Sequence, residues 1–229
     1  MLSSPAAELF ALQDPSYKAF HCRLIPTVDP ETVIGVRTPA LRRFARDFAK
    51  APEAASFLQQ LPHTYYEENN LHALLLERIK DYDEAVRALD AFLPYVNNWA
   101  TCDFFRLAAF RRRPPQLLPQ IRRWLATDRC YTVRFAIRML MDLYLDEAFD
   151  PAYPALVAGL RSDEYYVNMM QAWYFATALA KQYDAILPFL EEHRLPPVVQ
   201  QMTIRKAVES FRISPEQKEQ IRQTAGPKQ

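Results

Sequence analysis

The chain contains very few glycines, and this scarcity excludes several classes of protein. Only Gly35, Gly159 and Gly226 occur among 229 residues. Phosphate-binding loops of the Walker and dinucleotide types need clustered glycines, so neither motif is present. A β-rich protein turned by glycines is disfavoured for the same reason. Abundant Leu, Ala, Arg and Glu with few β-branched runs instead predict an all-α protein.

Cysteine pairs and long apolar runs are also missing. The three cysteines form no CxxC pair, which argues against a zinc site or a disulfide framework. The four histidines lack metal-ligand spacing, so we expect no metal and no cofactor. No apolar run reaches the roughly 20 residues that cross a bilayer, and the N-terminus lacks the regions of a signal peptide. We therefore expect a cytoplasmic protein without a membrane partner.

The charge is balanced overall but unevenly distributed. The chain has 28 Lys and Arg against 27 Asp and Glu, so its net charge does not indicate a nucleic-acid partner. Many arginines nevertheless fall before residue 130, among them Arg37, Arg42, Arg43, Arg46, Arg106, Arg111, Arg112, Arg113, Arg122 and Arg123. Such clustering allows local basic faces on a nearly neutral protein.

Apolar periodicity and proline-bounded breaks predict a chain of helices with an internal repeat. Long helices open at the aromatic residues Tyr66, Trp99, Tyr131 and Tyr166, about 32 to 35 residues apart, and another begins near Val198. This period is typical of helix pairs that stack into a solenoid whose longer helices line the concave side. We expect one domain over residues 1–229, with a loose tail at 225–229.

One stretch stands out as a candidate site. Asn98 is a good N-cap for a helix predicted to run from Trp99 to about Phe110. Trp99 and Asp103 are four residues apart and share one helix face. Both are placed in the first turn, where the helix dipole favours an ionised carboxylate. The alternative from spacing alone is structural, with Trp99 in the core and Asp103 as a capping residue.

Several segments together resemble one known family. The turn Gly35-Val36-Arg37-Thr38-Pro39, followed by Leu41-Arg42, resembles the N-terminal turn of the HEAT-like-repeat alkylpurine DNA glycosylases, the AlkD family. In that turn, Thr38 is expected to cap the helix that follows. The resemblance continues in the family's order through Tyr65-Tyr66-Glu67-Glu68, Asn98-Trp99, Cys102-Asp103, Val133-Arg134-Phe135-Ala136-Ile137 and Gln171-Ala172-Trp173. It covers about residues 20 to 212.

The resemblance implies a right-handed α-solenoid with a basic concave groove that holds duplex DNA with alkylated bases. The implied activity is excision of cationic N3- and N7-alkylpurines by a monomer. The matching catalytic positions are Asp103, Trp99, Trp173 and Arg134. Two alternatives from other classes remain: a helical-repeat protein that binds nucleic acid without catalysis, and a protein scaffold.

The residue types suit that chemistry. A cationic alkylpurine is already a good leaving group, so a carboxylate such as Asp103 can stabilise an oxocarbenium-like sugar and orient water. The faces of Trp99 and Trp173 attract a cationic nucleotide. Arg134 is expected to hold a flanking phosphate, with Arg138 on the same helix face as the other candidate for this contact. The candidate DNA contacts are Arg37, Arg42, Arg43, Arg106 and Arg138. Arg37 stands where some family members carry a polar amide.

Overall fold

The computed structural model describes residues 5–112 and 114–225, and within these ranges every regular element is helical. The only β contact recorded there is an isolated bridge between Gln13 and Val36. The all-α prediction is therefore confirmed for the described residues. None of their helices is long and apolar enough to cross a membrane. The helices are α1 (Ala6–Phe10), α2 (Pro15–Cys22), η1 (Pro30–Thr32), α3 (Thr38–Phe48), α4 (Glu53–Gln59), α5 (Tyr66–Leu76), α6 (Tyr82–Phe92), η2 (Leu93–Tyr95), α7 (Trp99–Phe104), α8 (Ala108–Arg111), α9 (Pro114–Leu125), α10 (Cys130–Leu143), α11 (Ala152–Ala158), α12 (Tyr165–Lys181), α13 (Tyr183–Glu191), α14 (Pro197–Glu209) and α15 (Pro215–Gln223).

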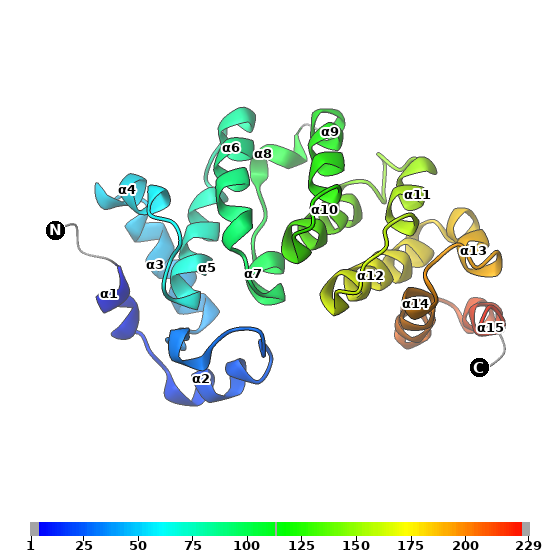
Figure 1. Ribbon diagram of the computed structural model, residues 1–229, viewed down its shortest axis with the longest axis horizontal. Coiled ribbons are helices and arrows are strands. Elements are labelled where there is room, and N and C mark those ends of the chain that lie inside the picture. Colours follow the sequence, from blue (N-terminus) through cyan, green and yellow to red (C-terminus); the bar gives the residue numbers. More distant parts are fainter. Residues whose placement is uncertain (1–4, 113, 226–229) are drawn as a thin grey trace. The chain divides into compact units, whose positions relative to one another are not determined.

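The chain divides into two compact units, residues 1–113 and 114–229. In the first unit, α5 packs against α3 on one side and α7 on the other, while α4 and α6 pack on its back (Figure 1). Every residue of α5 is buried, which explains why a helix carrying Glu67, Glu68 and two asparagines has no polar face toward water. Its polar side chains must therefore find partners inside the protein.

The second unit repeats the same arrangement. The long helix α12 packs between α10 and α14, and the shorter helices α9, α11, α13 and α15 lie against this layer (Figure 1). Because α12 is enclosed on several sides, its sequence Tyr-Tyr-Val-Asn-Met-Met-Gln-Ala-Trp is apolar over much of its circumference. Alternating longer and shorter helices are compatible with the predicted helical repeat. The handedness of the solenoid and the single-domain organisation stay predictions, and residues 226–229 of the predicted loose tail lie outside the described residues.

The predicted helix start at Asn98 is confirmed. The Asn98 side chain accepts a hydrogen bond from the Thr101 N–H at 2.7 Å, and Ser214 forms a capping box with Gln217 ahead of α15. The predicted cap at Thr38 is wrong. Arg37 occupies the N-cap position without a side-chain bond, and Thr38 is the first helical residue.

The helix that starts at Trp99 is shorter than predicted. It ends at Phe104, and an extended segment leads to the single turn α8. The extended segment places Phe105 in the core, where the ring is fully buried and meets Phe92 edge-on with centroids 6.3 Å apart. A continuous helix to Phe110 would give up this placement, so burial of an aromatic ring accounts for the early end.

Candidate functional site

Trp99 is held at the start of α7 by contacts with the N-terminal segment. Its indole Nε1–H donates to the carbonyl of Leu24 at 2.8 Å, 75 residues away in the sequence. The partly buried ring packs on a small cluster that includes Ile25, Val33 and Tyr66. These contacts fix the ring orientation, and they partly agree with the structural interpretation of Trp99 as a core residue.

Asp103 lies on the same short helix but not where the sequence placed it. Since α7 ends at Phe104, Asp103 is in the last turn of the helix rather than the first. The prediction that the helix dipole favours its ionised form is therefore wrong, because the C-terminal end of a helix carries partial negative charge. The Arg106 guanidinium supplies positive charge there, with Nη1 3.0 Å from the Asp103 carbonyl oxygen and 3.2 Å from that of Phe105.

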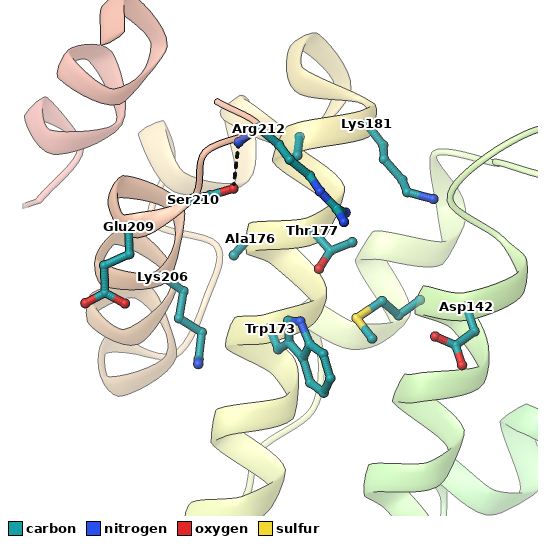
Figure 2. Close-up of a pocket in the computed structure, with 11 residues that line it drawn as sticks. Asp142, Trp173, Ala176, Thr177, Lys181, Lys206, Glu209, Ser210 and Arg212 are labelled. Carbon is teal, nitrogen blue, oxygen red and sulfur yellow. Dashed lines mark hydrogen bonds between the residues drawn. The ribbon is translucent and has the colours of Figure 1, made fainter. Parts of the chain in front are cut away.

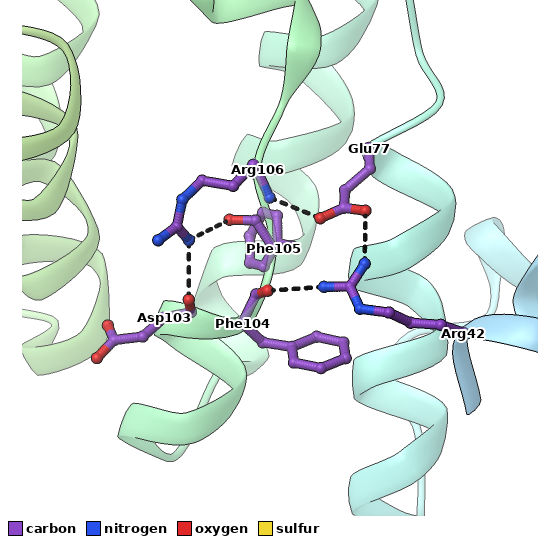
Figure 3. Close-up of polar contacts among 6 residues, drawn as sticks. All are labelled: Arg42, Glu77, Asp103, Phe104, Phe105 and Arg106. Carbon is purple, nitrogen blue, oxygen red and sulfur yellow. Dashed lines mark hydrogen bonds and ion pairs between the residues drawn. The ribbon is translucent and has the colours of Figure 1, made fainter. Parts of the chain in front are cut away.

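One carboxylate, Glu77, organises the end of α7. Its Oε1 accepts the backbone N–H of Arg106 at 2.8 Å, and its Oε2 pairs with Arg42 at 3.2 Å (Figure 3). Arg42 also donates to the Phe104 carbonyl at 3.2 Å, and its guanidinium lies 4.8 Å from the centroid of the Phe104 ring. The last carbonyls of α7, which have no partner within the helix, are thus satisfied by two arginines. In Figure 3 the Asp103 carboxylate points away from these contacts.

The family-like turn at Gly35 is fixed by another carboxylate, that of Glu67, which is buried. Glu67 accepts the backbone N–H groups of Ile34, Gly35 and Val36 at 2.8, 2.7 and 3.1 Å. Burial raises the pKa of Glu67, and these three donors oppose the shift. Gly35 has φ +96°, and a Cβ there would lie 2.6 Å from the Cβ of Lys18, so only glycine fits.

Glu67 and Glu68 both lie in the first turn of α5, where carboxylates interact favourably with the helix dipole. Glu68 accepts the N–H groups of Thr64 and Tyr65, which makes it part of a capping box. The role of Glu67 as the anchor of a loop more than 30 residues earlier was not predicted. Nothing in local sequence spacing reports a contact of that range.

The arginines predicted to contact DNA in the first unit differ in how they are used. Arg37 donates to Asp14 at 2.7 Å. Hydrogen bonds from the Ser16 hydroxyl, the Tyr17 N–H and Arg37 hold the pKa of Asp14 well below its usual range. Arg42 and Arg106 each donate a hydrogen bond to a carbonyl group at the end of α7. Arg43 is exposed.

Arg42 and Arg43 line a cavity of about 320 Å³ together with Arg46 and Arg78. Glu77 is the only acidic residue among those lining it. Such a cluster attracts anions. Arg78 follows the C-cap of α5 and was not predicted as a DNA contact. The packing of α3 against α5 brings it beside Arg43 and Arg46.

Arg134 and Arg138 lie on α10 in the second unit, and both are buried. Arg134 is 4% exposed and donates to the Tyr166 carbonyl of α12 at 2.9 Å. Arg138 is 1% exposed and pairs with Asp142 at 3.2 Å. A phosphate contact through Arg138 would require this pair to open. The assignment of that contact to Arg134 stays a prediction.

Trp173 projects from α12, which packs against the helix of Arg134, and its side chain is 40% exposed. It lines a cavity of about 530 Å³ between α10, α12 and α14. An exposed indole at such a place is available for contact with a ligand. Trp99 and Asp103 belong to the first unit, and Arg134 and Trp173 to the second. That the four residues form one site therefore stays a prediction.

The histidines and cysteines of the described residues were also considered as candidate reactive groups. His63 and His72, which sequence spacing did not connect, share a hydrogen bond of 2.9 Å. Burial and the neighbouring His63 lower the pKa of His72 to about 3. Burial raises the pKa of the Cys130 thiol to about 11, which suppresses the nucleophilic thiolate. Within the part of the chain that the structure describes, no group of acidic, histidine or cysteine side chains could hold a metal ion.

Layered helix pairs are typical of helical-repeat proteins, whose stacked repeats form extended binding surfaces. The chain belongs to the DNA alkylation repair enzyme family, which it matches over residues 6–211. This match confirms the resemblance drawn from the ordered sequence segments. A search of curated protein sequences found no match to the chain.

Proposed function

We propose that the protein is a DNA glycosylase that excises cationic N3- and N7-alkylpurines from duplex DNA. Membership of the DNA alkylation repair enzyme family supports the choice of alkylated DNA as substrate. The family membership does not by itself specify the reaction. The observation that carries the proposal is the construction of α7, where Trp99 and Asp103 share one face of a short helix whose two ends are fixed by long-range contacts.

The reaction needs little from the protein beyond electrostatics and positioning. As the C1′–N bond breaks, the cationic base keeps the bonding electron pair and leaves as a neutral alkylpurine. The sugar develops oxocarbenium character, which the Asp103 carboxylate stabilises. Water then adds its oxygen to C1′ and passes a proton to Asp103, from which it reaches solvent. The products are the free base and an abasic site.

The other residues serve binding in this proposal. The faces of Trp99 and Trp173 attract the cationic nucleotide, each by about 0.5–2 kcal/mol. Arg134 holds a flanking phosphate, and the cavity lined by Arg42, Arg43, Arg46 and Arg78 takes a phosphate farther along the duplex. The ion pair with Glu77 offsets part of the positive charge of Arg42. We therefore expect Arg43 and Arg78 to contribute more to DNA binding than Arg42 does.

The decisive experiment compares wild-type protein with Asp103→Asn in single-turnover excision of N7-methylguanine from a methylated duplex. The asparagine keeps the size of the side chain and removes its charge. We expect excision to slow by about 10²-fold or more, the scale for loss of one electrostatic stabiliser. Duplex affinity and melting temperature should remain close to those of the wild type.

Asp83→Asn serves as the matched control, because it removes an exposed carboxylate from α6. It should leave the excision rate unchanged. Equal rates for wild type and Asp103→Asn would remove Asp103 from the mechanism. Duplex binding by wild type without any base release would instead identify a non-enzymatic DNA-binding protein.

That non-enzymatic function is the second candidate, and one observation favours it. The Trp99 ring packs on the Ile25 cluster and its N–H is occupied by Leu24, as a purely structural tryptophan would be. The same excision assay separates the two candidates, because cation–π binding uses the face of the ring and does not need the N–H.

A further inference from the structure

The cavity beside Trp173 is lined by several cationic side chains that have no role in the proposed reaction. Three cationic side chains line it: Lys181 from the end of α12, Lys206 from α14 and Arg212 from the segment after α14 (Figure 2). Thr177 lies one turn after Trp173 on the same face of α12 and adds a hydroxyl. With a volume of about 530 Å³, the cavity has the size of a small-ligand site.

Two of these cations are available to a ligand. Lys181 is paired with Asp146. Among the residues that the structure describes, no ion pair involves Lys206 or the Arg212 guanidinium. In Figure 2, Lys206 extends toward the Trp173 ring and Arg212 extends over α12 toward Thr177. The two charges therefore reach the cavity from α14 and from the segment that follows it.

The two carboxylates that line the cavity weaken its positive charge only in part. Asp142 is paired with Arg138 on α10 at 3.2 Å. Glu209 lies on α14, and Figure 2 shows its carboxylate on the side of that helix away from Trp173. The side of the cavity next to the indole is thus cationic, with a hydroxyl donor beside it.

We propose that Lys206 and Arg212, with Thr177, bind a phosphate of the DNA backbone next to the nucleotide that Trp173 contacts. This inference rests on the proposed function. It adds a DNA contact from the part of the chain after Trp173, where no candidate was identified from the sequence. Lysine, arginine and hydroxyl side chains are the usual partners of backbone phosphates. Aromatic faces bordered by such cations are typical of nucleic-acid grooves. A free phosphate ion would use the cations but gain nothing from the exposed indole.

The test measures binding of wild type and the double variant Lys206→Ala/Arg212→Ala to an undamaged duplex over a range of salt concentrations. Loss of the contact with this one phosphate should reduce the slope of log affinity against log salt by about 1. At moderate salt the affinity should fall by about tenfold or more. The matched control is Arg205→Ala/Lys218→Ala, which removes the same charge from the same unit outside the cavity. It should change the slope much less.

A thermodynamic cycle then locates the contact on the DNA. Single phosphates of the duplex are replaced one at a time by neutral methylphosphonates. One replacement should weaken binding of wild type and of the control but have little further effect on the double variant, because partners in contact are not additive. If every replacement acts equally on all three proteins, the cavity does not bind a backbone phosphate.

The outcomes separate this inference from the proposed function. Base excision by wild type, combined with full affinity and slope in the double variant, overturns the phosphate site alone. Duplex binding with the expected loss in the double variant, but without base excision, overturns the glycosylase and retains the site. Displacement of the duplex by inorganic phosphate, at concentrations where the same ionic strength of chloride has no effect, would assign the cavity to a free anion instead.

Discussion

Burial strongly changes the acid–base chemistry of His72. It is buried on α5, hydrogen-bonded to His63 and stacked on Phe92 with the ring centroids 4.3 Å apart. A charged imidazolium in this place would lack solvent and would face a second imidazole. Its pKa therefore falls from 6.5 to about 3.

This shift predicts that the protein loses stability in mild acid. Between pH 6.5 and about 3 the unfolded chain binds a proton at His72 that the folded protein does not bind. The free energy of unfolding should therefore decrease as the pH falls through this range, by at most about 1.4 kcal/mol per pH unit for this group. Burial also lowers the pKa of His63, which acts in the same direction. Urea unfolding at a series of pH values measures the effect.

The substitution His72→Gln tests the assignment. Glutamine still hydrogen-bonds to His63 but does not titrate, so the variant should lose less stability on acidification, although it starts from a lower value. His193→Asn is the control, because it replaces an exposed histidine with φ 51°, a conformation that asparagine tolerates. Parallel pH profiles for wild type and His72→Gln would exclude His72 as the cause.

At the level of single residues, local contacts could be predicted from the sequence, whereas the partners of long-range contacts could not. The Asn98 cap followed from its position before an apolar helix and is confirmed. Arg42 and Arg106 were also singled out from the sequence, as candidate DNA contacts. Their hydrogen bonds to the last carbonyl groups of α7 could not be predicted, because they depend on where that helix ends. That point is decided by the burial of Phe105, a tertiary effect that local spacing does not contain.

Helix α7 depends on contacts from outside itself. It has six residues, too few for a helix to be stable alone. Its first turn is fixed by Asn98 and by the bond from Trp99 to Leu24, and its last carbonyls by Arg42 and Arg106. The Glu77 carboxylate contacts both arginines: it pairs with the side chain of Arg42 and accepts a hydrogen bond from the backbone N–H of Arg106. In the proposed mechanism, Glu77 is therefore a positioning residue for Asp103.

We predict that Glu77→Gln slows base excision by about tenfold or more while duplex affinity is unchanged or slightly higher. Glutamine can still accept the Arg106 N–H, but it loses the ion pair with Arg42. The end of α7 then becomes less well fixed, and small displacements of a catalytic group are costly. Arg42, freed from Glu77, becomes available to phosphate. Single-turnover rates and equilibrium binding, measured well below the melting temperature, give the two quantities separately.

Glu84→Gln, an exposed change on α6, is the control for loss of one carboxylate. It should alter neither quantity. A Glu77→Gln variant that loses affinity and rate together would indicate that Glu77 supports the arginine-lined cavity rather than Asp103. One with wild-type rate and affinity would show that Arg42 and Arg106 fix α7 without it.

Helix existence could be predicted from the sequence, whereas helix ends and long-range anchors could not. The long helices predicted to open at Tyr131 and Tyr166 and to begin near Val198 correspond to α10, α12 and α14, which start within one residue of these positions. The helix at Trp99 was extended too far because Phe105 and Phe110 continue an apolar pattern that helical and extended segments share. The pockets, in turn, arise only when helices pack, so Arg78 and Lys206 gave no sequence signal.

For the whole molecule, the proposed site needs residues from both units. Trp99 and Asp103 come from residues 1–113, whereas Arg134 and Trp173 come from 114–229. If the four act on one nucleotide, the two units must hold a fixed geometry during the reaction. Positioning of this kind accounts for a large part of a typical rate enhancement.

We therefore predict that a flexible Gly-Ser insertion directly before Pro114 slows excision by about 10²-fold or more. Helix content by circular dichroism should not change, because the insertion lies outside the helices of either unit. Duplex affinity should fall less than the rate, since each unit keeps its own basic cavity. The same Gly-Ser segment added at the C-terminus is the control and should have no effect. If excision survives the insertion unchanged, one unit alone contains the reacting groups, and the Asp103→Asn and Arg134→Ala variants would then show which unit it is.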